Sequence, residues 1–100
     1  MKSTPEGKVK AKVKRVLADL NAYYVMPMGT GFGNAGAPDF LVCFRSKFIG
    51  IECKAGSNKP TALQYKNLKD IQDCGGMALI VDETNINQLH EVMRSYENEI

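Results

Sequence analysis

Three charged residues, Asp39, Glu52 and Lys54, interrupt stretches of sequence that are otherwise apolar. Asp39 directly precedes the apolar run 40–44, and the other two close the run 48–54. Aspartate is disfavoured in strands, and a buried carboxylate without a partner is costly, so the three residues require an explanation. Carboxylate oxygens suit Mg²⁺ or Mn²⁺, and a nearby lysine can stabilise charge on a phosphoryl oxygen. Together they are the parts of a site for metal-assisted phosphodiester hydrolysis. A structural salt bridge from Lys54 to either carboxylate is the alternative.

The two apolar runs predict a β-hairpin, because each is rich in β-branched and aromatic residues and a short polar turn joins them. A two-residue turn at Ser46-Lys47 would place Asp39 opposite Lys54 and diagonal to Glu52, roughly 7 Å away, with all three on one face. A three-residue turn would send these charges to opposite faces. The two-residue turn also gathers the apolar side chains on the other face, namely Phe40, Val42, Phe44, Ile49 and Ile51.

A first helix is predicted to end near Asn21. Ser3 and Glu6 form a capping-box pattern at its start, and Pro5 suits its first turn. Apolar residues at helical spacing give it an inward face, namely Val9, Val13, Val16, Leu17 and Leu20. Extending this stripe backward by three residues places Glu6 on the same face, so Glu6 is either a cap or a candidate site residue.

The rest of the chain predicts four further elements. A strand at 23–28 precedes the glycine-rich segment 29–36, which lies between two strands and so favours a loop over the active site rather than a nucleotide cradle. A helix capped by Thr61 ends before Gly75-Gly76, and the apolar run 77–81 indicates a strand buried on both faces. A last helix opens at 82–84 and carries inward-facing Ile86, Leu89, Val92 and Met93. The order α-β-β-β-α-β-α over residues 1–100 predicts a single α/β domain in which helices flank a mixed sheet.

The net charge of +2 conceals a division along the chain. Residues 1–60 carry ten lysines and arginines against four acidic residues, and residues 61–100 carry three against seven. A basic half favours a polyanionic partner such as DNA, and solvated surface side chains are the alternative. The candidate DNA contacts are Lys8, Lys12, Arg15, Lys47 and Lys59.

No apolar run approaches the roughly 20 residues of a membrane span, and the first residues lack an apolar signal core. The three cysteines, Cys43, Cys53 and Cys74, are widely spaced and the chain has one histidine, which disfavours zinc. Buried thiols in a reducing cytoplasm are the expectation for all three.

With Pro38-Asp39 followed after a turn by Glu52-Cys53-Lys54, the sequence resembles the PD-(D/E)XK nuclease superfamily. It is more closely similar to the VRR-NUC domain, a small nuclease module found alone in phages and bacteria and appended to a larger eukaryotic repair nuclease. The resemblance covers nearly the whole chain. Its matching segments are 36–40, 49–55, Thr61-Ala62-Leu63-Gln64 and the Gly75-Gly76 turn.

This resemblance implies a restriction-endonuclease-like αβββαβα fold and a Mg²⁺- or Mn²⁺-dependent endodeoxyribonuclease. Asp39 and Glu52 would be metal ligands, and the backbone carbonyl of Cys53 would complete the protein's share of the shell. Lys54 would position or activate the attacking water.

Two further residues gain roles from the resemblance. Glu6 matches an acidic residue on the first helix of many members, where it would join the catalytic site and is a candidate further ligand. Gln64 would lie beside the site at the start of its helix, and a solvated helix residue is the alternative.

Standalone members act on branched DNA, including four-way (Holliday) junctions, as homodimers. For this chain we expect the same partners and neither a nucleotide cofactor nor a membrane. The resemblance therefore implies a cytoplasmic protein of a bacterium or a phage-infected cell. A non-catalytic nucleic-acid-binding module, and a nuclease subunit active only in a larger complex, are the competing classes.

Overall fold

The computed structural model describes residues 4–28 and 35–98 of the chain. Within them it shows a four-stranded mixed sheet and three α-helices in the predicted order, which confirms the α/β fold class. The elements are α1 (Pro5–Asp19), β1 (Tyr23–Val25), β2 (Phe40–Phe44), β3 (Lys47–Cys53), α2 (Ala62–Asp73), β4 (Met77–Val81) and α3 (Leu89–Ser95), with 3₁₀ turns at Ile86–Gln88 and Tyr96–Asn98. Most of the predicted glycine-rich loop lies outside the described residues. None of the described helices is both long and apolar enough to cross a bilayer.

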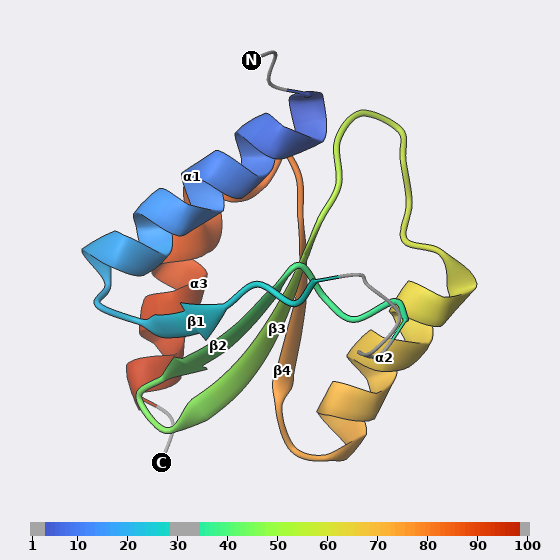
Figure 1. Cartoon of the computed structure of the whole chain (residues 1–100). Helices are drawn as coiled ribbons and strands as arrows, with labels where there is room; N and C mark the ends of the chain where they lie inside the picture. Colours follow the sequence, from blue (N-terminus) through green and yellow to red (C-terminus); the bar gives the residue numbers. More distant parts are fainter. Residues whose placement is uncertain (1–3, 29–34, 99–100) are drawn as a thin grey trace.

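The sheet has the order β1-β2-β3-β4, in which the first three strands are antiparallel and β4 runs parallel to β3. Helices α1 and α3 cover one face, and α2 lies against the other (Figure 1). The core lies under α1 and α3, and both the predicted helical stripe and the predicted apolar face of the hairpin are buried there. Its members include Val9, Val13, Leu17, Phe40, Val42, Ile49, Ile51, Leu89 and Met93.

Helix α1 begins one residue later than the capping-box pattern predicts. Thr4 is the N-cap, and its Oγ1 accepts a hydrogen bond of 2.9 Å from the Gly7 N–H. The predicted box between Ser3 and Glu6 is therefore wrong, and Ser3 itself lies outside the described residues. The cause is Pro5, because the residue before a proline is kept out of the helical conformation, and Thr4 is extended. With Thr4 as the N-cap, the third helical residue is Gly7, so Glu6 is not at the position that completes a capping box.

The β2–β3 hairpin turns at Arg45-Ser46 rather than at the predicted Ser46-Lys47, so the strand pairing slides by two residues. Both turn residues have a left-handed backbone, with φ of 51° and 68°, as this kind of two-residue turn requires. Contacts hold Arg45 in place: its guanidinium lies 5.7 Å from the centroid of the Phe44 ring, and its Nε lies 3.5 Å from Glu97 Oε1. A slide by two residues keeps each side chain on its predicted face and changes only its cross-strand neighbour.

Strand β1 is shorter than predicted. The strand ends at Val25 instead of continuing to residue 28, and Pro27 has no N–H with which to extend the ladder.

Cys53 is buried as predicted, but Cys43 and Cys74 are exposed. Cys43 lies on the sheet face opposite the core, and Cys74 follows the last turn of α2.

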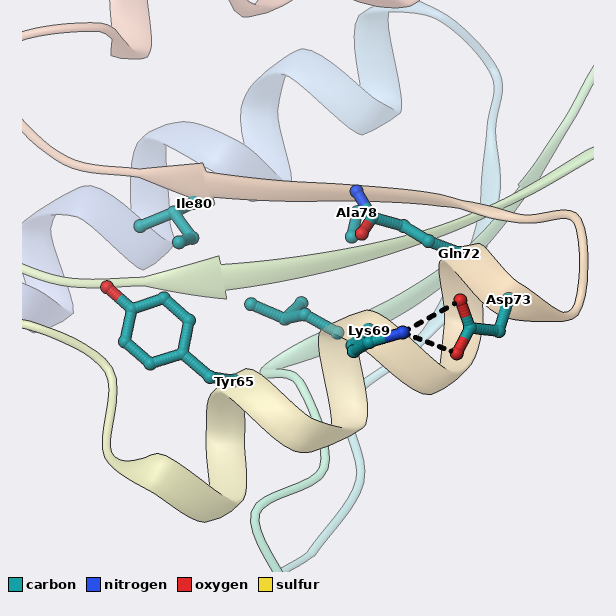
Figure 2. Close-up of a pocket in the computed structure, with 7 residues that line it drawn as sticks. Tyr65, Lys69, Gln72, Asp73, Ala78 and Ile80 are labelled. Atoms are coloured by element: carbon teal, nitrogen blue, oxygen red, sulfur yellow. Dashed lines mark hydrogen bonds and ion pairs between the residues drawn. The ribbon is translucent and has the colours of Figure 1, made fainter.

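Strand β4 is an edge strand of the sheet, and most of its residues are only partly buried, so the prediction that it is buried on both faces is wrong. Ile80 is 37% exposed and lines a groove of about 550 Å³ between α2 and β4. Figure 2 shows Tyr65 extending from α2 toward this strand, and the ion pair between Lys69 and Asp73 at one end of the groove. Asp73 is the single carboxylate in the lining, so this groove lacks the carboxylate pair on which the predicted chemistry depends.

The segment before Asp39 is fixed by close packing at Gly36. This glycine has φ of +79°, and an added Cβ would lie 2.8 Å from Leu63 Cγ and 3.0 Å from the Leu63 carbonyl carbon. Gly56 has a similar φ of +62° but open space where a Cβ would point. We expect G36A to lower the free energy of unfolding in urea by about 2–4 kcal/mol, because it adds overpacking to backbone strain. G56A should cost only about 1–2 kcal/mol, and equal losses in the two variants would contradict the packing.

Candidate active site

The candidate site lies where β2 begins and β3 ends, beside the first turns of α1 (Figure 1). Phe40 pairs with Ile51, so Asp39, one residue earlier, comes opposite Glu52 rather than opposite Lys54 as predicted. Asp39 Oδ2 accepts a hydrogen bond of 2.8 Å from the backbone N–H of the next residue of β3, Cys53. The slide in register therefore brings the two predicted carboxylates closer together than the sequence indicates.

Glu52 is the one charged residue among the buried side chains of the described chain, with 1% of its surface exposed. Its Oε2 lies 3.5 Å from Lys54 Nζ, while its Oε1 is buried and has no hydrogen-bond partner among the described residues. Burial, and then the negative charge of Asp39, raise the pKa of Glu52 to about 7, against the opposing pull of Lys54. A buried carboxylate with an unpartnered oxygen is a position at which a cation would be stabilising.

Helix α1 supplies a second lysine to the site. Lys10 Nζ lies 3.4 Å from Asp39 Oδ1 and 3.5 Å from Glu6 Oε2, so it joins these two carboxylates. Burial lowers the pKa of Lys10, but the charges and hydrogen bonds of Asp39 and Glu6 outweigh this and raise it. Glu6 thus reaches the site through Lys10, on the inward face that the helical stripe predicts. Lys10 is not among the site residues predicted from the sequence, although its position four residues after Glu6 was a usable signal.

Cys53 can contribute to the site only through its backbone. Its side chain lies in the core with no exposed surface. Burial, followed by the charges of Asp39 and Glu52, raises the pKa of the thiol to about 12. The thiol therefore stays protonated at neutral pH, and a protonated thiol is neither a metal ligand nor a nucleophile.

Gln64 has a role that differs from both predictions, which were a residue beside the site and a solvated helix residue. Its side-chain oxygen accepts the Thr61 N–H at 2.9 Å, and its own N–H donates to Thr61 Oγ1 at 3.2 Å, which forms a complete capping box. Gln64 makes no hydrogen bond to Asp39, Glu52 or Lys54 within the described part of the chain. The structure therefore does not join Gln64 to the carboxylate pair.

One of the predicted DNA contacts lies away from the candidate site. Lys8, Lys12 and Arg15 are exposed on α1, the helix that also carries Lys10, and Lys59 is exposed in the loop after β3. Lys47 begins β3 while Glu52 lies near its end, which separates their Cα atoms by about 17 Å at the usual rise of a strand. Lys47 is therefore outside the cluster around Glu52.

The donor atoms of the site fit a hard divalent cation. Asp39 and Glu52 offer carboxylate oxygens, which are the ligands that Mg²⁺ and Mn²⁺ prefer. A group of three or more acidic, histidine or cysteine side chains able to share one metal ion is absent from residues 4–28 and 35–98. An ion held by this pair would thus need the Cys53 carbonyl and water to complete its shell, as Mg²⁺ commonly does.

A scan of the sequence against models of known protein families gives no match, and a search of curated protein sequences also gives none. A function is therefore proposed from the residues of the site and from the motif that they form.

Proposed function

We propose that the chain is a Mg²⁺- or Mn²⁺-dependent endonuclease that hydrolyses phosphodiester bonds in DNA. The observation that carries this proposal is the facing pair Asp39 and Glu52: a buried oxygen of Glu52 has no partner among the described residues, and Lys54 lies 3.5 Å from the other oxygen. The motif resemblance to the VRR-NUC domain supports the same reaction.

Each residue has a distinct task in this reaction. Asp39 and Glu52, with the carbonyl of Cys53, would hold the ion, and the hydrogen bond from the Cys53 N–H fixes the orientation of Asp39. A bound divalent ion supplies positive charge that stabilises the phosphate oxygens as phosphorus is attacked. Lys54, which is mostly buried, orients the attacking water by donating a hydrogen bond to it. Its proximity to Glu52 restricts the positions that the ammonium group can take.

We propose branched DNA, such as a four-way junction, as the substrate and a homodimer as the active form. Lys8, Lys12 and Arg15 are exposed on α1, the helix that borders the site, where they would contact phosphates. Cutting a junction symmetrically requires two sites related by a twofold axis, which a homodimer supplies. This substrate also follows from the motif resemblance.

A non-catalytic DNA-binding module is the second candidate, and the ion pairs of the site favour it. Lys10 neutralises Asp39 and Lys54 neutralises Glu52 without any metal ion, as structural salt bridges would. On this alternative, replacing either lysine would reduce stability or DNA affinity, and the chain would have no cleavage activity to lose.

Cleavage of labelled linear, flap and four-way DNA by the purified chain tests the proposal, with Mg²⁺, Mn²⁺ or EDTA in parallel. We expect metal-dependent incision that is fastest on the four-way substrate and absent in EDTA. Binding without incision under every condition would favour the binding module. Incision that appears only after addition of a host-cell extract, and that requires Asp39, would favour a subunit of a larger nuclease.

A further inference from the structure

Lys10 stands apart from the other basic residues of α1. The rest, namely Lys8, Lys12, Lys14 and Arg15, are exposed, while Lys10 is partly buried and turned toward the carboxylates. Its ammonium group lies between Asp39 and Glu6, at 3.4 Å and 3.5 Å. A flexible lysine side chain loses conformational entropy when it is held in this way, so the two carboxylates are what keep it there.

Lys10 contacts the oxygen of Asp39 that is not hydrogen-bonded to the backbone of β3. Oδ2 accepts the Cys53 N–H at 2.8 Å, and Oδ1 is the oxygen nearest Lys10. A divalent cation that binds the pair Asp39 and Glu52 needs an oxygen of Asp39. It would therefore meet a positive charge already placed at that carboxylate, and like charges this close repel strongly.

The charges of the cluster change sign when such a cation is added. Glu6, Asp39 and Glu52 carry three negative charges when ionised, against the two positive charges of Lys10 and Lys54. A divalent ion makes the total positive, which weakens the hold of Asp39 on Lys10. The surplus positive charge then favours a phosphate group of DNA as the new partner of the ammonium group.

We infer that Lys10 substitutes for the divalent cation in the metal-free protein and becomes a phosphate-binding residue when the ion displaces it from Asp39. This inference rests on the proposed metal-dependent function and assigns it a residue that the motif does not contain. Lys10 thereby couples the binding of the divalent cation to the binding of DNA. The cation competes with Lys10 for Asp39, and the displaced Lys10 strengthens DNA binding only when the cation is present.

Binding of Mn²⁺, followed by the EPR signal of the free ion, tests the competition without any measurement of activity. We expect K10M to bind Mn²⁺ about three- to tenfold more tightly than the wild type, because an ion pair and a repulsive charge are both removed. K10R keeps the charge and should retain the wild-type affinity. K14M is the matched control, since it makes the same substitution at an exposed position of the same helix and should leave Mn²⁺ binding unchanged.

Fluorescence anisotropy with a labelled DNA duplex tests whether the displaced Lys10 strengthens DNA binding. Ca²⁺ is used here as a cation that also takes oxygen ligands. K10M should bind DNA about threefold more weakly than K14M in Ca²⁺, and equally well in EDTA. Mn²⁺ affinity that is unchanged or lower in K10M would overturn the inference while leaving the proposed nuclease intact. A wild-type protein that binds no Mn²⁺ would overturn both.

Discussion

A D39N protein is expected to lose about a thousandfold in the rate of Mn²⁺-dependent cleavage while it remains folded. Asparagine keeps an oxygen that can accept the Cys53 N–H, so the link between β2 and β3 survives. What it removes is the negative charge that would bind the ion and that pairs with Lys10. Single-turnover rates at saturating protein measure the chemical step separately from DNA binding.

A second carboxylate variant makes the comparison specific. Asp70 is exposed on α2 and pairs only with Lys66, four residues earlier, among the described residues. D70N makes the same chemical change far from the site in the fold and should cleave at the wild-type rate. If D39N cleaved within a few-fold of D70N while both bound DNA, the assignment of Asp39 as a metal ligand would be wrong.

The free energy of unfolding of the metal-free protein is expected to fall as pH rises toward about 8, because of Glu52. The pKa of this carboxyl is about 7 in the folded chain, above its ordinary value of 4.5. The folded state therefore binds more protons than the unfolded state between these values. The stabilisation is fully present below the ordinary pKa and is lost as pH rises through the folded one, with a magnitude on the order of 3 kcal/mol.

E52Q should remove this pH dependence. The amide carries no charge, and the variant also loses the ion pair with Lys54. We expect the variant to be more stable than the wild type by about 1–3 kcal/mol in EDTA at about pH 8. Urea unfolding at a series of pH values measures both curves. Added Mn²⁺ should stabilise the wild type and not E52Q, since the ion binds the carboxylate pair of the folded state. If the free energy of unfolding of the wild type did not change over this range of pH, burial would not raise the pKa of Glu52 as stated.

The faces of the hairpin were predictable from the sequence, but its register was not. Alternation of apolar and polar residues separates Asp39 and Glu52 from the core whichever two-residue turn is chosen. The turn itself carries no Asn-Gly or Asp-Gly signal. Arg45 takes a left-handed conformation among contacts with Phe44 and with Glu97, which comes from the end of the chain. Such a contact between distant parts of the sequence cannot be read from local patterns.

Lys10 and Gln64 show the same division between local and tertiary causes. Lys10 is one of four lysines at alternate positions of α1, and only the docking of this helix beside Asp39 distinguishes it from the others. Gln64 is fixed by a local pattern, the capping box with Thr61, which the spacing of these two residues in the sequence already allows. The sequence thus predicted the carboxylates of the site and missed the cation that neutralises one of them.

Anomalous diffraction from crystals of the chain grown with Mn²⁺ tests the central claim most directly, that Asp39 and Glu52 together form a metal site. We predict an anomalous peak within ligand distance of one oxygen from each carboxylate and of the Cys53 carbonyl oxygen, at about 2.0–2.3 Å. The D39N protein in the same crystals should lack this peak. A peak elsewhere in the chain, with both carboxylates still paired to Lys10 and Lys54, would contradict the account.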